Sequence, residues 1–196
     1  SVKRRQADGD WFDEWGARRH WVRRAHGGGY WEWVDFPLGS VDTIAGLRGY
    51  RWPRVYMFDW DDYARQLDAH EGLVINGWHH VIFAATWFLR GIENALLDLS
   101  LNPEFAHHLI ARITDYECEL IEKTLDVGAR RIQNLITFDD RGMQTGLMMS
   151  PAMFPTFYAA PVRRCFELTH EKGVGIFLPY RRFRRRTHAR PCGAGY

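Results

Sequence analysis

The chain has 196 residues, of which 46% are hydrophobic, and its formal net charge is +2 at pH 7. This composition is typical of a globular domain with a substantial core and excludes a disordered chain. No segment contains the roughly 18 consecutive apolar residues of a membrane span, and the first residues, SVKRRQADGD, lack the apolar stretch of a secretory signal. We therefore expect a cytoplasmic protein that contacts no membrane, and three widely spaced cysteines fit a reducing compartment.

The first 36 residues are rich in tryptophan and glycine but show no sustained periodicity. We predict an irregular or hairpin-like segment around Gly27-Gly28-Gly29. The tryptophans form either a ligand-binding wall or packing contacts, and we favour packing because large aromatic side chains most often bury area. Residues 37–53 then predict a short helix with Ser40 or Asp42 as its cap.

Three aspartates, Asp59, Asp61 and Asp62, precede the next helical stretch. Clustered carboxylates suggest a metal site, but acidic residues at a helix start more often cap it and offset its dipole. We favour the cap.

Leu73-Val74-Ile75 has the pattern of a buried strand, and Asn76-Gly77 predicts a turn that ends it. His79 follows at the carboxyl end of this strand. In parallel α/β folds the carboxyl ends of strands carry the chemistry, so His79 is a candidate substrate-binding residue. A histidine that only makes structural hydrogen bonds is the alternative.

An apolar helical region spans residues 81–101, and we expect Gly91 to interrupt it. Asn102-Pro103-Glu104 is a strong helix start, and an apolar stripe at spacings of three and four continues to Gly128. This pattern predicts a long amphipathic helix that packs on a sheet.

The segment from Arg130 to Phe157 is the most informative part of the chain. A short apolar run, Ile132 to Phe138, predicts a second strand, and it ends in Asp139 and Asp140. A polar loop, residues 141–146, follows, and Ser150-Pro151 predicts the start of a helix that runs to Glu171.

Pro161 should kink this last helix, and residues 174–178, VGIFL, predict a third buried strand. The alternation of strands and helices is typical of a parallel α/β protein.

The catalytic candidates are Asp140 and, as its alternative, Asp139, because only one of two adjacent strand-end residues points toward a ligand. Gln144 and Arg141, in the loop that follows, are candidate substrate-binding residues. The alternative is a purely structural role, in which these carboxylates accept loop N–H groups around Gly142 and Gln144 stabilises the loop by hydrogen bonds. The residues themselves leave both interpretations open.

The composition changes at Pro179, and residues 179–196 are rich in arginine and contain no acid. A basic arm that binds nucleic acid is one interpretation. We favour a disordered or non-native tail, translated out of frame, over a nucleic-acid partner, and we divide the chain into a domain of residues 1–178 and this tail.

Several stretches, in this order and spacing, resemble the uroporphyrinogen decarboxylase superfamily over about residues 11–178. They are Asp13-Glu14-Trp15-Gly16, the GYWEWVDFPL segment ending in Pro37-Leu38, Trp52-Pro53, Leu89-Arg90-Gly91-Ile92-Glu93-Asn94 with Asp98, Asn102-Pro103-Glu104, Phe138-Asp139-Asp140-Arg141-Gly142-Met143-Gln144, and Ser150-Pro151-Ala152-Met153-Phe154.

The resemblance implies a (β/α)8 TIM barrel, of which this chain would be a part that is incomplete at both ends, since such barrels need about 250 residues. It implies one of two chemistries. The first is cofactor-free decarboxylation of a tetrapyrrole in porphyrin biosynthesis. The second is methyl transfer from a methyl donor, for which the complete parent enzyme would use zinc and a corrinoid.

The segment from Asp13 to Pro53 looks more like the methyltransferase-like members. Against this, their zinc ligands are similar to a His-x-Cys motif directly after the third strand, where this chain has Pro179-Tyr180-Arg181. We therefore place the decarboxylase type first, with no metal site. A third hypothesis is an inactive fragment that cannot close its barrel and would aggregate or form a homodimer through exposed strand edges.

Overall fold

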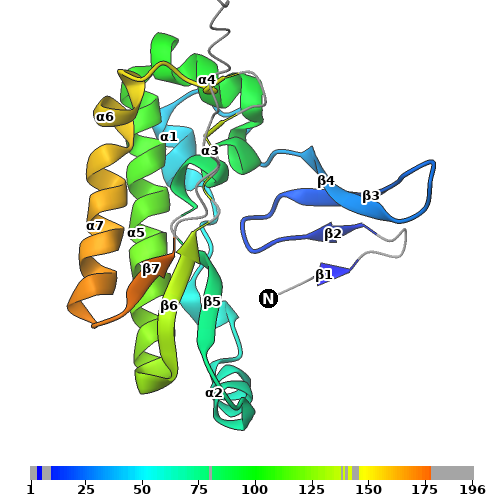
Figure 1. Cartoon of the computed structure of the whole chain (residues 1–196). Helices are drawn as coiled ribbons and strands as arrows, with labels where there is room; N and C mark the ends of the chain where they lie inside the picture. Colours follow the sequence, from blue (N-terminus) through cyan, green and yellow to red (C-terminus); the bar gives the residue numbers. More distant parts are fainter. Residues whose placement is uncertain are drawn as a thin grey trace, which may run out of the picture.

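The computed structural model describes residues 4–5, 10–79, 81–137, 139, 141–142 and 146–177. It contains two separate small sheets and a layer of helices (Figure 1). One sheet is antiparallel and has strand order β1-β2-β3-β4, and the other is parallel and has strand order β5-β6-β7. The predicted α/β class is confirmed by the parallel sheet and its helices.

The antiparallel sheet is formed by the first 35 residues. Its strands are β1 (Arg4–Arg5), β2 (Trp11–Phe12), β3 (Arg18–Arg23) and β4 (Gly29–Asp35). Strands β3 and β4 form a hairpin whose turn places Gly27 at φ 89° and Gly28 at φ 72°, backbone conformations that glycine adopts without strain. The hairpin prediction is confirmed.

Tryptophans of this segment join it to the rest of the molecule. The Trp33 ring stacks on Phe88 with centroids 4.0 Å apart and an interplanar angle of 9°. Trp15 is buried in the main hydrophobic core, where its ring lies edge-on to Tyr116 at 4.7 Å. The packing interpretation holds for these two residues, whereas Trp21 is 40% exposed.

Two short helices follow the hairpin sheet. Helix α1 (Ile44–Gly49) is capped by Thr43, whose Oγ1 accepts the Gly46 N–H at 3.1 Å. The predicted caps, Ser40 and Asp42, are wrong because the helix begins later than expected. After η1 (Val55–Met57), helix α2 (Trp60–Ala69) is capped by Asp59, which accepts the Asp62 N–H at 2.8 Å. The cap interpretation of this aspartate cluster is confirmed.

The parallel sheet contains β5 (Val74–His79), β6 (Ile132–Thr137) and β7 (Gly175–Phe177). The predicted turn at Asn76-Gly77 is wrong, because β5 continues through it and an irregular register between Asn76 and His79 absorbs the glycine. The two crossover connections are helical. They are formed by α3 (Ile82–Arg90), α4 (Ile92–Leu101), α5 (Pro103–Gly128) and η2 (Ala129–Arg131) between β5 and β6, and by α6 (Met153–Phe157) and α7 (Ala159–Glu171) between β6 and β7.

The expected partial (β/α)8 barrel is wrong. A barrel of this kind closes eight tilted parallel strands on one another. Here β6 lies between β5 and β7, and each of these outer strands has no second neighbour among the described residues. The strands before β5 pair antiparallel in their own sheet, so they do not extend the parallel one. The architecture is an open three-stranded parallel sheet with an appended antiparallel sheet.

The helix breaks follow from glycine and proline. Gly91, at φ 78°, separates α3 from α4 as predicted. The predicted single helix from Pro151 to Glu171 is instead two helices that meet at Tyr158. Pro161, in the first turn of α7, has no N–H to donate to the Phe157 carbonyl four residues earlier, so the helical hydrogen bonding is interrupted and the helix divides at Tyr158. Ser150 is not the cap, because the helix begins at Met153.

Helix α5 is the centre of the core. It runs beside α7 and along the parallel sheet (Figure 1). Its apolar stripe is buried, as the sequence pattern predicted, and the side chains that carry it include Phe105, Leu109, Ile113 and Ile121. Burying each such side chain contributes about 1.5–3 kcal/mol. None of the described helices is both long and apolar enough to cross a membrane.

A buried ion pair fixes the two helices that precede α5. The guanidinium of Arg90 binds both carboxylate oxygens of Asp98, through Nε at 2.8 Å and Nη2 at 3.2 Å. Its Nη1 donates to the carbonyl oxygens of Leu38 and Val41, both at 2.6 Å. Arg90 therefore joins α3, α4 and the chain before α1 at a single point.

Candidate functional site

The carboxyl ends of β5 and β6 meet at one edge of the parallel sheet. His79, the last residue of β5, pairs with Thr137, the last residue of β6. Both strands point toward the end of the molecule that contains α3, α4 and α6 (Figure 1). We call this edge, with Asp139, Arg141 and Tyr158 around it, the carboxyl edge.

Asp139 connects the carboxyl edge to the beginning of α3. Its Oδ1 accepts the Ala84 N–H at 2.8 Å, and its own N–H donates to Thr137 Oγ1 at 3.3 Å. Val81, at the start of α3, makes no side-chain cap hydrogen bond. Asp139 therefore supplies, from the segment after β6, the acceptor that a helix normally receives from its own cap, a contact that contributes about 1 kcal/mol.

Tyr158 is a buried phenol beside this carboxylate. Its ring lies edge-on to Phe83 at 5.6 Å, and its hydroxyl lies 3.4 Å from Thr86 Oγ1, which itself donates to the Phe83 carbonyl. Burial raises the pKa of Tyr158, and the hydrogen bond with Thr86 lowers it in part. The charges have smaller effects: that of Asp139 raises the pKa, and that of Arg141 lowers it. The phenol is therefore neutral near pH 7, and both ionic groups lie close enough to act on it.

Arg141 lies in the segment that follows β6. Its guanidinium lies 4.3 Å from the centre of the Phe154 ring, a cation–π contact that orients it. Its carbonyl oxygen accepts the Met148 N–H at 3.0 Å, and Gly142 pairs with Leu147 in an antiparallel bridge. A guanidinium held in this way can bind a carboxylate or a phosphate with its N–H groups.

The structure thus brings two of the predicted site residues together, Asp139 and Arg141. It places the backbone of His79 at the same edge. Asp140 and Gln144 lie outside the described residues, so their roles stay predictions. Tyr158 was missed, because an aromatic residue in a helical pattern is indistinguishable from an ordinary core residue.

Two motif residues of the superfamily resemblance have structural roles away from the carboxyl edge. Asp13 is buried and accepts the N–H groups of Trp15 and Ala17 at 3.1 and 3.0 Å. Its other oxygen accepts hydrogen bonds from Arg19 at 3.2 Å and from Trp33 Nε1 at 3.3 Å. Arg90, described above, is the second. Asp13 and Arg90 therefore both stabilise the fold.

Metal-binding side chains do not gather in the described part of the chain: no group of three or more His, Cys, Asp or Glu residues there has a geometry that would hold an ion. No ligand set for zinc is therefore assigned.

A comparison of the sequence with models of known protein families gave no match, and a search of curated proteins gave none either. The superfamily resemblance therefore stays a prediction that rests on the motifs and on their order.

Proposed function

We propose that the chain is an enzyme of the uroporphyrinogen decarboxylase type, which removes carboxyl groups from a tetrapyrrole at the carboxyl edge without a cofactor. The observation that supports this proposal is the gathering of the Asp139 carboxylate and the Arg141 guanidinium near the neutral phenol of Tyr158. We expect the enzyme to act in the cytoplasm. An open sheet is compatible with this function, since ligands bind outside the carboxyl ends of parallel strands in open sheets as well as in barrels.

The charged groups have roles that their chemistry allows. An ionised carboxylate accepts the pyrrole N–H groups and stabilises the cation that forms when the ring is protonated. Asp140 is the candidate for this role, because one oxygen of Asp139 already binds the amide of Ala84. Asp139 then positions the strand end against α3, and Arg141 binds a carboxylate of the substrate.

Methyl transfer is the second candidate function, favoured by the similarity of the segment from Asp13 to Pro53 to the methyltransferase-like members. In that case the carboxyl edge would orient the methyl donor. Because no zinc ligand set is assigned among the described residues, we derive no step through zinc or a corrinoid.

The test is a titration of the chain with uroporphyrin, followed by an anaerobic assay with uroporphyrinogen. We expect binding without added metal, and we expect Arg141→Ala to weaken it about tenfold or more because a charged hydrogen bond is lost. Asp140→Asn should lower turnover about a hundredfold or more. The matched control is Arg163→Ala, an exposed arginine on α7, which should change neither.

Two outcomes would count against the decarboxylase type. Binding of cobalamin together with a zinc requirement would favour methyl transfer. Equal loss of uroporphyrin binding in Arg141→Ala and Arg163→Ala would mean that general positive charge, and not the carboxyl edge, attracts the porphyrin.

A further inference from the structure

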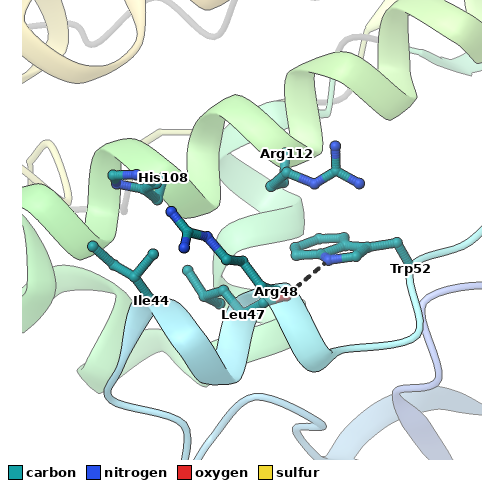
Figure 2. A pocket seen from close by; sticks show the side chains of 6 residues that line it. All are labelled: Ile44, Leu47, Arg48, Trp52, His108 and Arg112. Atoms are coloured by element: carbon teal, nitrogen blue, oxygen red, sulfur yellow. Dashed lines mark hydrogen bonds between the residues drawn. The ribbon is translucent and has the colours of Figure 1, made fainter.

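Two adjoining pockets lie away from the carboxyl edge, between α1, residues 50–57 and the first half of α5. Figure 2 shows the smaller one, about 290 Å³, with the side chains of α1 facing those of α5. The larger one is about 540 Å³. They share Arg48, Trp52 and Arg112, so we treat them as one site and call it the arginine pocket. It shares no lining residue with the carboxyl edge.

The arginine pocket has a concentrated positive charge. Arg48, Arg51, Arg54 and Arg112 all line it and are all exposed. Of these four arginines, only Arg112 has a carboxylate of the described residues within 4.0 Å, that of Asp115 at 3.7 Å. That carboxylate is shared, because it also binds Arg164 at 2.6 Å. A concave surface with four guanidinium groups and little opposite charge attracts anions.

The floor of the arginine pocket is a fixed aromatic surface. The Trp52 Nε1 donates to the Leu47 carbonyl at 3.0 Å, the dashed contact in Figure 2, and Tyr50 lies edge-on to the indole at 5.2 Å. The Arg112 guanidinium lies 5.5 Å from the centre of the indole ring. Tyr56, at the larger pocket, is 79% exposed and presents a second ring. These rings suit a flat ligand, because stacking needs a planar partner.

We propose that the arginine pocket binds a small molecule that carries several phosphate or carboxylate groups on a flat aromatic body. The larger pocket lies within the range of roughly 300–1,000 Å³ that small-molecule sites occupy. The guanidinium groups bind the anionic groups, and Trp52 and Tyr56 contact the ring. The arginines converge on one pocket, which fits a small ligand better than an extended nucleic-acid backbone.

The test is a calorimetric titration with three probes at low and at raised salt. ATP carries phosphates on a flat base, benzenehexacarboxylate carries carboxylates on a ring, and tripolyphosphate carries phosphates without a ring. We expect at least one ring-bearing probe to bind more tightly than tripolyphosphate, and the tighter of the two identifies phosphate or carboxylate as the anionic group. The double variant Arg51→Ala/Arg54→Ala should weaken that binding about tenfold or more.

The matched control is Arg23→Ala/Arg24→Ala, which removes the same charge from the β3–β4 hairpin and should change binding less than about twofold. Circular dichroism checks that both double variants fold. Equal weakening by the two double variants, no binding of any probe, or tripolyphosphate binding as tightly as both ring-bearing probes would overturn the proposal. So would a single-stranded oligonucleotide that binds through Arg51 and Arg54 more tightly than every probe. Because these variants leave Arg141 intact, failure here is separate from failure of the proposed decarboxylase function.

Discussion

The antiparallel sheet β1–β4 and the helical core around α5 are stabilised in different ways. Two buried carboxylates, Asp10 and Asp13, organise the sheet by binding arginine, histidine and backbone groups around them. The core is stabilised by apolar burial along α5, and the buried ion pair of Arg90 with Asp98 joins α3 to α4. Loss of Asp13 should therefore destabilise the antiparallel sheet locally, whereas loss of Arg90 should destabilise the helical core as a whole.

The largest effect is expected in the core. Arg90→Met removes the charged partner of Asp98 and leaves that carboxylate buried without a countercharge, at a cost of about 3–5 kcal/mol in the free energy of unfolding. Urea denaturation measures this cost. The control, Arg164→Met, removes the exposed pair with Asp115 and should cost less than about 1 kcal/mol. Similar losses in the two variants would show that Arg90 does not join the helices of the core.

A smaller and local effect is expected in the antiparallel sheet. Asp13→Ala removes the acceptor for Trp15, Ala17 and Arg19 and should cost about 2–3 kcal/mol. Hydrogen exchange should become faster in β2, β3 and β4 and stay unchanged in α5. Asp35→Ala is the control, since Asp35 is exposed and only its 4.0 Å contact with Arg18 is lost. Faster exchange in α5 would mean that the two regions unfold together.

The Asp139 contact is expected to contribute less to the free energy of unfolding than Arg90 or Asp13. Asp139→Ala leaves the Ala84 N–H at the start of α3 without its acceptor, and we expect a loss of about 1 kcal/mol. Asp139→Asn keeps an acceptor oxygen and should lose less. Thermal unfolding compares the two variants. A loss that is equal in both would show that the charge, and not the hydrogen bond, stabilises the helix.

The last effect depends on pH. The hydrogen bond from His20 is the main cause that holds the pKa of Asp10 below its ordinary value of about 3.9, and Arg18 adds to it. A lowered pKa in the folded state gives stability that is present above the unfolded pKa and is lost as pH falls through the folded pKa. The sheet should therefore loosen first in acid, visible as faster exchange in β3. In Asp10→Asn this acid dependence should disappear, and its persistence would assign it to another group.

Local patterns predicted several elements because their causes lie close together in the sequence. Asn102-Pro103-Glu104 and Gly128 set the ends of α5, Gly91 separated two helices, and short apolar runs gave the parallel strands. The barrel was wrong because closure depends on which distant strands pair, and a local pattern does not carry that information.

The site could be predicted only in part for the same reason. Asp139 and Arg141 follow a recognisable strand, so their place at its carboxyl end was visible. Tyr158 comes near Asp139 only because the junction between α6 and α7 packs against Phe83 of α3. The arginine pocket was equally hidden, because Arg112 joins the arginines around α1 through tertiary packing.

Hydrogen exchange with and without uroporphyrin tests the carboxyl edge most directly. We predict that bound porphyrin slows exchange in the first turn of α3 and at the end of β6, and leaves the antiparallel sheet unchanged. Slowed exchange confined to α1 and residues 50–57 would place the porphyrin in the arginine pocket. That result, or binding with no protection near Ala84 and Thr137, would contradict the proposed site.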